Sequence, residues 1–543
     1  MAYDIQHIFV LMLENRSFNH FLGFCGIEGV EGAATTMSNP DKHASPAPLS
    51  CDAPDWPTAD PNHEYCDVQL QIFGNRTPAA DAPSTMQGFV KSCDNSVMKC
   101  FTPQTLPILN QLAREFTICD HWFSPMPGPT WPNRFFVHAA SSGGLDNSPS
   151  DAHSAIAATF PGWWGFEFQN GTIYDRLNAA DLPWRVYHGD CFPQVLAIKD
   201  LVRTFVNHSG EFDTIIPDHP DDPFKTDLMS KESRYNAAYT FIEPNYGLLS
   251  KGKEGNSQHA MGSASAGEAF IKYVYETIRN SPIWEQSVLV VTYDEHGGFF
   301  DHVAPCPCEP PGDNPVNHEQ AQYPKNCAFD HYGVRVPAVI VSPWIRQGRA
   351  WHTPTDHTTI IRTIRDIFPQ LEQRQLTDRD GSAPSFVELF EAELQRRDGD
   401  ATAAPKVLSP IAQIANAAAP LAKVVSMKPV ADDMEPIDNE LSGFSRIAAD
   451  VQRVMEESTP KTPPNATQLR LRFPGVQFPG ITETVESPTG SLTGSAKSGG
   501  VRSKESLEAT AAVATRLPKL NTQGDARKYI KSVLTQMYAS RNP

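Results

Sequence analysis

The chain has 543 residues, of which 40% are hydrophobic and 10% aromatic, so it can bury a sizeable core by itself. Its 45 basic and 63 acidic residues give a formal net charge of -18, which argues against a nucleic-acid-binding surface and against electrostatic adhesion to an anionic membrane. No stretch approaches the roughly 20 apolar residues that a membrane span needs, so we expect no transmembrane segment.

The start of the chain and its cysteines bear on where the protein works. The first predicted strand is not preceded by the basic and apolar leader of a classical signal peptide. We therefore expect either a cytoplasmic location or export by a leaderless route, as for a secreted effector. The ten cysteines all lie at or before Cys327, and their pattern leaves free thiols, disulfides and a structural zinc site as alternatives.

The first predicted element is a strand at residues 8–13, IFVLML, an apolar run with no room before it for a helix. Glu14 and Asn15 follow it directly. A carboxylate and an amide therefore stand at the carboxyl end of a buried strand, where ligands bind in open α/β sheets.

The segment MPGPTWPNRFF, residues 126–136, combines a tight Pro-Gly-Pro loop with the start of a helix. Pro132 suits the first helical position, which places Thr130 just before the helix N-terminus. Unpaired backbone N–H groups and the positive end of the helix dipole favour a phosphate anion there. Helix capping or loop packing is the alternative role for Thr130.

A second strand-like segment, SVLVVTYDE (287–295), is apolar through Val291 and then offers Asp294 and Glu295, much as the first run does. Side chains at the carboxyl ends of neighbouring parallel strands converge, so four oxygen ligands are predicted to meet: Glu14, Asn15, Asp294 and Glu295. Solvated acids at separate strand ends are the alternative. Burying three carboxylates together is costly unless a cation compensates them. The oxygen-rich set suits Mg²⁺ or Ca²⁺ best, and Mn²⁺, Fe or Zn²⁺ if a histidine joins.

Helices are predicted between and after the strands. They cover residues 266–280 and 356–368, and a further strand is predicted within residues 334–344. Alternation of strands and helices predicts an α/β protein with a mainly parallel central sheet covered on both faces. We assign residues 1–395 to this α/β domain, which contains every candidate chemical motif.

Composition changes after about residue 400, which predicts a smaller C-terminal extension at residues 396–543. It contains an Ala-rich segment, a Gly/Ser/Thr linker and two amphipathic helices, predicted at residues 442–457 and 524–540. These helices either pack on the main domain or serve as a partner-docking or export tail.

Three segments closely resemble the signatures of a bacterial phosphoesterase family: ENRSFNHFLG (14–23), GPTWPNR (128–134) and DEHGGFFDHV (294–303). This family contains non-specific phospholipases C and acid phosphatases and is a branch of the alkaline phosphatase superfamily. The resemblance spans about residues 5–395. It implies a three-layer α/β/α sandwich and a hydroxyl nucleophile activated by a divalent metal ion.

Carried over position by position, the resemblance implies these metal ligands: Glu14, Asn15, Asp294, Glu295 and Thr130. Thr130 also matches the nucleophile, and Asn133 matches an amide that contacts the phosphate.

Histidines are the natural general acids near neutral pH. His63 in DPNHEY and His259 in NSQHA resemble the active-site histidines of the family and are our first choices. His302 and His188 come second. Four others are interpreted as packed or solvated: His20, His121, His138 and His357.

The resemblance implies a phospholipase C that splits a glycerophospholipid such as phosphatidylcholine into diacylglycerol and a phosphorylated head group, through a phosphothreonine intermediate. Threonine at position 130 resembles the phospholipase branch more than the acid-phosphatase branch, where serine is common. A broad-specificity acid phosphatase that uses the same residues is the alternative. The expected partners are a phospholipid or phosphate ester and, transiently, a membrane surface.

Two further alternatives receive less support from the residues. All the expected ligands and the nucleophile are present, which disfavours a non-catalytic binding protein. The motif that carries the modified residue of sulfatases is not found.

We also expect that the C-terminal helices cover the active-site mouth or guide lipid to it.

One position departs from the family pattern. Asn19 stands where the family usually has an acid. Asparagine keeps a hydrogen-bond acceptor but loses the charge, which we expect to shift the pH optimum or the metal affinity.

Overall fold

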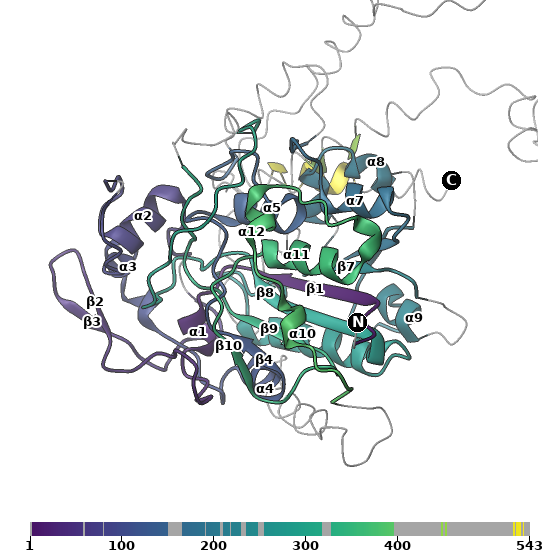
Figure 1. Ribbon diagram of the computed structural model, residues 1–543. Helices are drawn as coiled ribbons and strands as arrows, with labels where there is room; N and C mark the ends of the chain where they lie inside the picture. Colours follow the sequence, from purple (N-terminus) through teal and green to yellow (C-terminus); the bar gives the residue numbers. More distant parts are fainter. Residues whose placement is uncertain are drawn as a thin grey trace, which may run out of the picture.

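The computed structural model describes residues 3–57, 60–79, 81–149, 165–190, 192–206, 210–217, 219–229, 235–247, 255–317 and 327–395, together with 447–448, 451–452, 525–526, 528–533 and 536. Within these residues a central sheet lies between two layers of helices (Figure 1). The predicted α/β class and the three-layer sandwich are confirmed.

Eight strands form the central sheet, in the order β10-β4-β9-β8-β1-β7-β5-β6. Their bounds are β1 His7–Leu13, β4 Thr117–Cys119, β5 Trp184–His188, β6 Phe212–Thr214, β7 Tyr239–Glu243, β8 Ser287–Tyr293, β9 Ala338–Val341 and β10 Arg349–Trp351. Only the pairs that β9 makes with β8 and β4 are antiparallel. The other seven strands therefore point the same way, and their carboxyl ends share one edge of the sheet. A separate pair, β2 (Ser38–Pro40) and β3 (Pro46–Pro48), is antiparallel.

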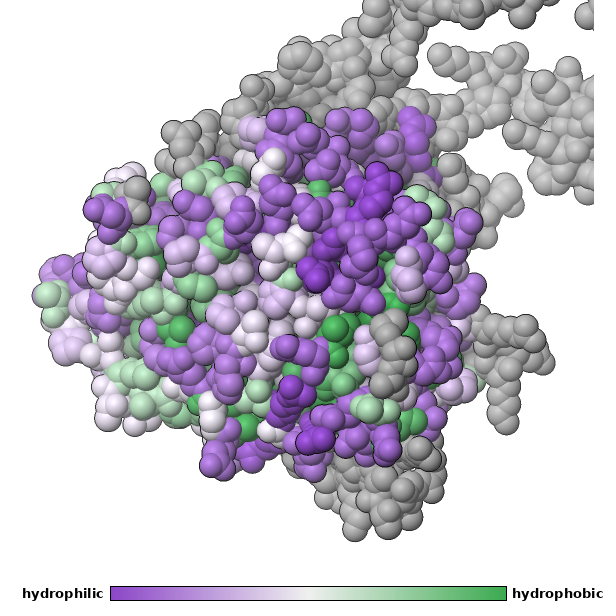
Figure 2. All heavy atoms as spheres, in the orientation of Figure 1, coloured by the Kyte–Doolittle hydropathy of each residue, from purple (hydrophilic) through white to green (hydrophobic). Residues whose placement is uncertain are grey.

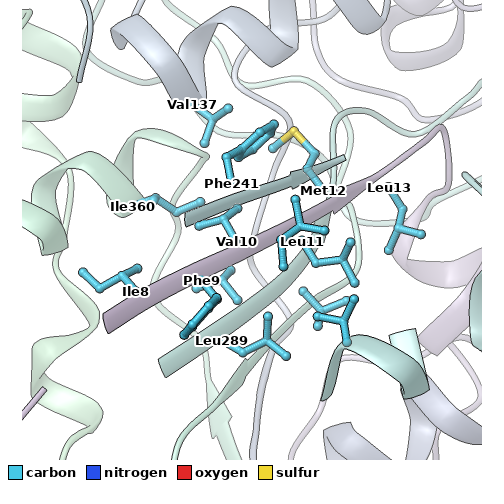
Figure 3. Close-up of a cluster of buried hydrophobic side chains, with 14 of the residues drawn as sticks. Ile8, Phe9, Val10, Leu11, Met12, Leu13, Val137, Phe241, Leu289 and Ile360 are labelled. Atoms are coloured by element: carbon cyan, nitrogen blue, oxygen red, sulfur yellow. The ribbon is translucent and has the colours of Figure 1, made fainter. Parts of the chain in front are cut away.

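Strand β1 runs through the middle of the core. All seven of its side chains are buried, because it is flanked by β7 and β8 and covered on both faces. Figure 3 shows Val10 on the same side as Val137 of α5 (Thr130–Ala139) and Ile360 of α11 (Thr358–Ile367). An uninterrupted apolar sequence is what such a position requires.

The helices divide between the two faces of the sheet (Figure 1). One layer contains α5, α7 (Ile173–Ala179), α11 and α12 (Asp378–Ser382), and the other contains α4 (Pro107–Glu115), α9 (Pro223–Met229) and α10 (Ala264–Arg279). The remaining helices are α1 (Phe18–Leu22), α2 (Tyr65–Phe73), α3 (Phe89–Ser92) and α8 (Leu201–Val206). The elements predicted from periodicity are confirmed as β1, β8, β9, α10 and α11.

The predicted C-terminal extension is described only in short pieces. Ile447 and Val451 from its first predicted helix are buried, as are Ile530 and Val533 from its second, and all four belong to the same hydrophobic cluster as β1. These pieces pack on the main domain, which was one of the two alternatives for the C-terminal helices. The Ala-rich segment and the linker lie outside the described residues, and the domain boundary at residue 395 stays a prediction.

Thiols and membrane-spanning helices can be assessed for the described part of the chain. The nine cysteines within it are all unpaired, and its metal-capable side-chain groups contain no cysteine, which favours the free-thiol alternative. None of the helices in that part has the length and apolar character needed to cross a bilayer.

Helix α4 is capped from another helix. The residue at its N-cap position, Leu106, has no side-chain hydrogen-bond acceptor. Glu268 of α10 caps the helix instead. The Glu268 carboxylate accepts the backbone N–H of Ile108 and, at 2.9 Å, that of Leu109. Burial raises the pKa of Glu268 to about 7, although these two hydrogen bonds lower it. The Glu268 carboxyl group that caps α4 therefore keeps its proton to a higher pH in the folded protein than in the unfolded chain.

This pKa predicts a pH-dependent stability. Between pH 4.5 and about 7 the unfolded chain loses the Glu268 proton while the folded chain keeps it, so the free energy of unfolding should fall as pH rises through this window. Over the whole window, the free energy of unfolding should fall by roughly 3 kcal/mol. Glu268→Gln has no proton to lose. Urea unfolding at several pH values between 4.5 and 7 should give a difference between wild type and variant that changes with pH; parallel profiles would contradict the prediction.

Candidate active site

The predicted oxygen ligands lie together at the carboxyl ends of the two central strands. β1 pairs with β8 in a register that sets Leu13 beside Tyr293, so the residues that follow leave the sheet side by side. The four side chains are at most 2% exposed: Glu14, Asn15, Asp294 and Glu295. The structure thus brings together what the sequence analysis expects to converge, and metal binding by these groups stays a prediction.

Backbone turns after the two strands hold the carboxylates in place. Asp294 Oδ1 accepts the backbone N–H of Asn15 at 3.0 Å and of Glu295 at 2.7 Å. Asn15 has a φ of 55°, in the left-handed region that asparagine tolerates better than most residues. A Cβ on Gly297 would lie 2.3 Å from the Asn15 carbonyl oxygen, so only glycine fits there.

Thr130 faces this cluster from the first turn of α5. Its buried hydroxyl Oγ1 donates to Asn15 Oδ1 at 3.2 Å. The helix begins at Thr130 itself with Pro129 as its N-cap, two positions earlier than expected, and Pro132 is the third helical residue. Proline fits throughout the first turn because those N–H groups have no partner within the helix.

Asn133 shapes the loop that presents Thr130. Its Oδ1 accepts the backbone N–H of Met126 at 3.0 Å, and its Nδ2 donates to the carbonyl oxygens of Gly128 at 2.8 Å and Pro129 at 3.0 Å. The amide is therefore engaged at both ends with residues 126–129. The direct phosphate contact implied for Asn133 stays a prediction, and loop positioning is the role that these contacts support.

The two first-choice histidines lie together at the same site. His63 Nδ1 donates to the carbonyl oxygen of Pro61 at 2.6 Å, which leaves Nε2 facing Asn15 Nδ2 at 3.4 Å and Glu295 Oε1 at 3.9 Å. The ring of His259 is 6.5 Å from that of His63, and Asp60 lies within 4.0 Å of both. The sequence analysis did not predict Asp60 as a site residue, although it lies three residues before His63 in the same DPNHEY segment.

The electrostatic surroundings keep His63 protonated. Burial lowers its pKa, but the nearby carboxylates of Glu295 and Asp60 outweigh burial and raise the pKa to about 10. The positive ring in turn helps to lower the pKa of Glu295 against the opposing effect of burial. Burial raises the pKa of Asp294.

Arg134 is a site residue that the sequence analysis missed. It lies one helical turn after Thr130, and its position in GPTWPNR was the available signal. Its Nε donates to Asp294 Oδ2 at 3.0 Å, and its Nη2 lies 3.8 Å from Glu14 Oε1. Burial lowers the pKa of Arg134, but Tyr246, Asp294 and Glu14 raise it further, so the guanidinium stays charged.

Two of the remaining histidines contact backbone carbonyl oxygens. His188 Nδ1 contacts the Asp190 carbonyl oxygen at 2.6 Å, and His357 Nε2 contacts the Asp294 carbonyl oxygen at 2.8 Å. Burial lowers the pKa of His357 to about 4, so this ring is a neutral support for the strand end.

Asn19, the departure from the family pattern, lies beside a different ion pair. Its Oδ1 accepts from Arg335 Nη2 at 3.2 Å, and its Nδ2 is 2.9 Å from His302 Nδ1. Arg335 is already paired with Asp301 at 3.0 Å. An acid at position 19 would therefore add charge to this ion pair, and its effect on metal affinity stays a prediction.

The residues fit a divalent cation. Glu295 Oε1 is buried and has no hydrogen-bond partner among the described residues, which is costly for a carboxylate oxygen unless a cation binds it. Three buried carboxylates stand against one guanidinium, so the set stays negative even with His63 charged. Carboxylate and amide oxygens are the ligands that hard divalent ions prefer.

Comparison with known proteins identifies the family of the chain. The model of the Phosphoesterase family matches residues 5–370. The chain belongs to the phosphoesterase family. This phosphoesterase is therefore a phosphoric ester hydrolase, and the family resemblance of its three signature segments is confirmed.

Two curated relatives show how this phosphoesterase compares with named proteins. Non-specific phospholipase C6 of Arabidopsis thaliana is 34% identical over 404 residues, which cover 70% of this chain and 71% of the relative. Phospholipase C B of Mycobacterium tuberculosis is 29% identical over 416 residues, which cover 67% and 73%. Among solved structures, an alkaline phosphatase superfamily protein from Vibrio parahaemolyticus is 14% identical, covers 51% of this chain and 64% of its own, and has a TM-score of 0.29.

Removing the Arg134 charge should damage both fold and catalysis. Arg134→Gln leaves Asp294 and Glu14 without their buried cation, and breaking such a pair costs about 3–5 kcal/mol. Arg365→Gln is the matched control, because Arg365 pairs with buried Asp380 at 3.2 Å on α11 and α12. Thermal unfolding should show both variants destabilised, whereas phosphoester turnover below their unfolding temperatures should be lost only in Arg134→Gln. Equal turnover in the two would contradict a role for Arg134 in the site.

Proposed function

We propose that this phosphoesterase is a phospholipase C that hydrolyses glycerophospholipids to diacylglycerol and a phosphorylated head group, with Thr130 as its nucleophile. The observation that carries the proposal is the buried Thr130 hydroxyl, which is held 3.2 Å from Asn15 Oδ1 at the N-terminus of a ten-residue helix. The names of the plant and mycobacterial relatives support the lipid substrate.

Each chemical requirement of the reaction has a residue to meet it. A divalent cation held by Glu14, Asn15, Asp294 and Glu295 would lower the pKa of the Thr130 hydroxyl and offset phosphoryl charge. The first N–H groups of α5 and the guanidinium of Arg134 favour the same anionic oxygens. Ca²⁺, Mg²⁺, Mn²⁺, Fe and Zn²⁺ all stay candidates for the cation.

The reaction then proceeds in two displacements. The Thr130 hydroxyl loses its proton to solvent and its Oγ1 attacks phosphorus, the bond from phosphorus to the glycerol oxygen breaks, and a protonated histidine donates its proton to that oxygen. His63, which lies beside the carboxylates of Glu295 and Asp60, is the first choice for this donor, and His259 is the second. Water then attacks the phosphothreonine, which releases the phosphorylated head group and restores Thr130.

The test compares a lipid and a soluble ester on the same protein. Purified enzyme should release phosphocholine from phosphatidylcholine faster than it hydrolyses a soluble phosphomonoester, and a chelator should abolish both. Thr130→Ala should lower kcat/KM by roughly 10⁴-fold or more, because the covalent route is lost. Thr130→Ser keeps a hydroxyl and is the matched control, which should retain most of the activity.

Two outcomes would overturn parts of this proposal. Turnover of the phosphomonoester with no action on the lipid would favour the acid-phosphatase alternative. Full activity in Thr130→Ala would exclude Thr130 as the nucleophile.

Membrane contact is proposed to be local. On the face shown in Figure 2, hydrophobic residues lie in small groups among hydrophilic ones. Met261 is 48% exposed, and its backbone N–H donates to His259 Nδ1 at 3.4 Å, so an apolar side chain lies beside the candidate site. We propose that it inserts into the lipid surface.

Met261→Ser should therefore slow the turnover of phosphatidylcholine vesicles but not of a soluble ester. The expected loss is roughly 10-fold, because burying a methionine side chain is worth about 1.5 kcal/mol or more. Met229→Ser is the matched control, since Met229 is 39% exposed at the end of α9. Equal effects of the two variants on vesicles would contradict the insertion of Met261.

A further inference from the structure

A second group of ligand-type side chains lies on the same edge of the sheet as the candidate active site. Asp120 follows β4 and His352 follows β10, and these parallel strands pair Cys119 with Trp351. The two side chains therefore leave the sheet side by side, with His352 Nδ1 2.8 Å from Asp120 Oδ1. β9 and β8 separate β4 from β1, which places this group about 14 Å from the strand end of β1 at the usual strand spacing.

His121 completes the group. Its Nδ1 lies 3.0 Å from the same oxygen, Asp120 Oδ1, while the other oxygen of Asp120 accepts the backbone N–H of Glu31 at 2.8 Å. One ligand atom from each of the three residues, Asp120, His121 and His352, lies within 4.8 Å of the others. The sequence analysis gave His121 a packed or solvated role, because nothing in the sequence places it beside His352.

The two ring nitrogens of His121 both face carboxylates. Nε2 lies 3.2 Å from Glu31 Oε2, on the opposite side of the ring from Asp120. A neutral imidazole has one N–H, so if Glu31 accepts it, the lone pair on Nδ1 points at a carboxylate oxygen. That contact is repulsive unless a second proton or a metal ion lies between the two atoms.

We propose that Asp120, His121 and His352 bind a zinc-type divalent transition-metal ion, at a site separate from the catalytic one. Two imidazole nitrogens and one carboxylate oxygen suit Zn²⁺, Co²⁺ or Ni²⁺ better than Mg²⁺ or Ca²⁺. Ligand atoms about 3.3 Å apart would match tetrahedral bonds of about 2.0 Å, so the rings need only a small shift. Glu31 orients His121, as carboxylates do for metal-bound histidines.

The surroundings explain what the ion would do. The side chain of His352 is 53% exposed and that of Asp120 is fully buried. The ion would therefore lie between solvent and the end of β4, and a water molecule could take its fourth coordination position. Arg335 Nη1 donates to the Asp120 carbonyl oxygen at 2.8 Å and so braces the strand end from within. The proposed role is a clamp across β4 and β10 at the border of the sheet.

The test measures metal content and not activity, so it does not depend on the proposed lipase function. Full-length protein is stripped with a chelator, dialysed against Zn²⁺ or Co²⁺, and analysed for bound metal and for the ligand-field absorption of Co²⁺. His121→Gln and His352→Gln should each bind one equivalent less than wild type. Glu31→Gln should bind the same number of ions with about 10- to 100-fold weaker affinity at this site.

The matched control is His331→Gln. His331 Nδ1 lies 2.9 Å from Asp330, its neighbour in the chain, which repeats the Asp120–His121 arrangement without being part of a metal-capable group among the described residues. It should bind as much metal as wild type. If His121→Gln and His352→Gln also match wild type in stoichiometry and affinity, the group is a set of hydrogen-bonded charges and the proposal is wrong. Because His352 is half-exposed, its variant should fold even if His121→Gln does not.

Discussion

The hydrogen-bonded pairing of β1 with β8 is the constraint on which the chemistry of this phosphoesterase depends. Both strands are buried along their whole length, so polar side chains can follow only where the strands end. The register sets Leu13 beside Tyr293, and both chains therefore turn out of the sheet at the same level. A slip of one residue would move every apolar side chain to the other face and would also separate Glu14 from Asp294.

Burying three carboxylates at the ends of two neighbouring strands creates an electrostatic problem that several groups share. Arg134 binds Asp294 and approaches Glu14, while His63 lies near Glu295 and stays protonated. Backbone N–H groups satisfy Asp294 Oδ1. Glu295 Oε1 accepts no hydrogen bond from the described residues, although His63 Nε2 lies 3.9 Å away, and the net negative charge of the set is the physical reason to expect a cation there.

The same edge of the sheet carries the second ligand group, because β4 and β10 run parallel to β1 and β8. Arg335 contacts both regions: it donates to the Asp120 carbonyl oxygen and to Asn19 Oδ1 on α1, the helix within the signature segment that contains Glu14 and Asn15. The departure at Asn19 therefore lies between the two groups. The two groups follow two different pairs of parallel strands, β1 with β8 and β4 with β10, so both lie on the same edge of the sheet.

The sequence by itself determined the local elements and which polar residues follow the two central strands. The apolar runs before Glu14 and before Asp294 had to be buried strands, and the order of strands and helices required a parallel sheet covered on both faces. The oxygen ligands were recognisable because they directly follow those strands. Tertiary structure alone decided the contacts between residues that are distant in the chain. Arg134 reaches Asp294 across 160 residues, and Asp120 meets His352 across 232, because strand order and register, which no local pattern encodes, place their backbones side by side.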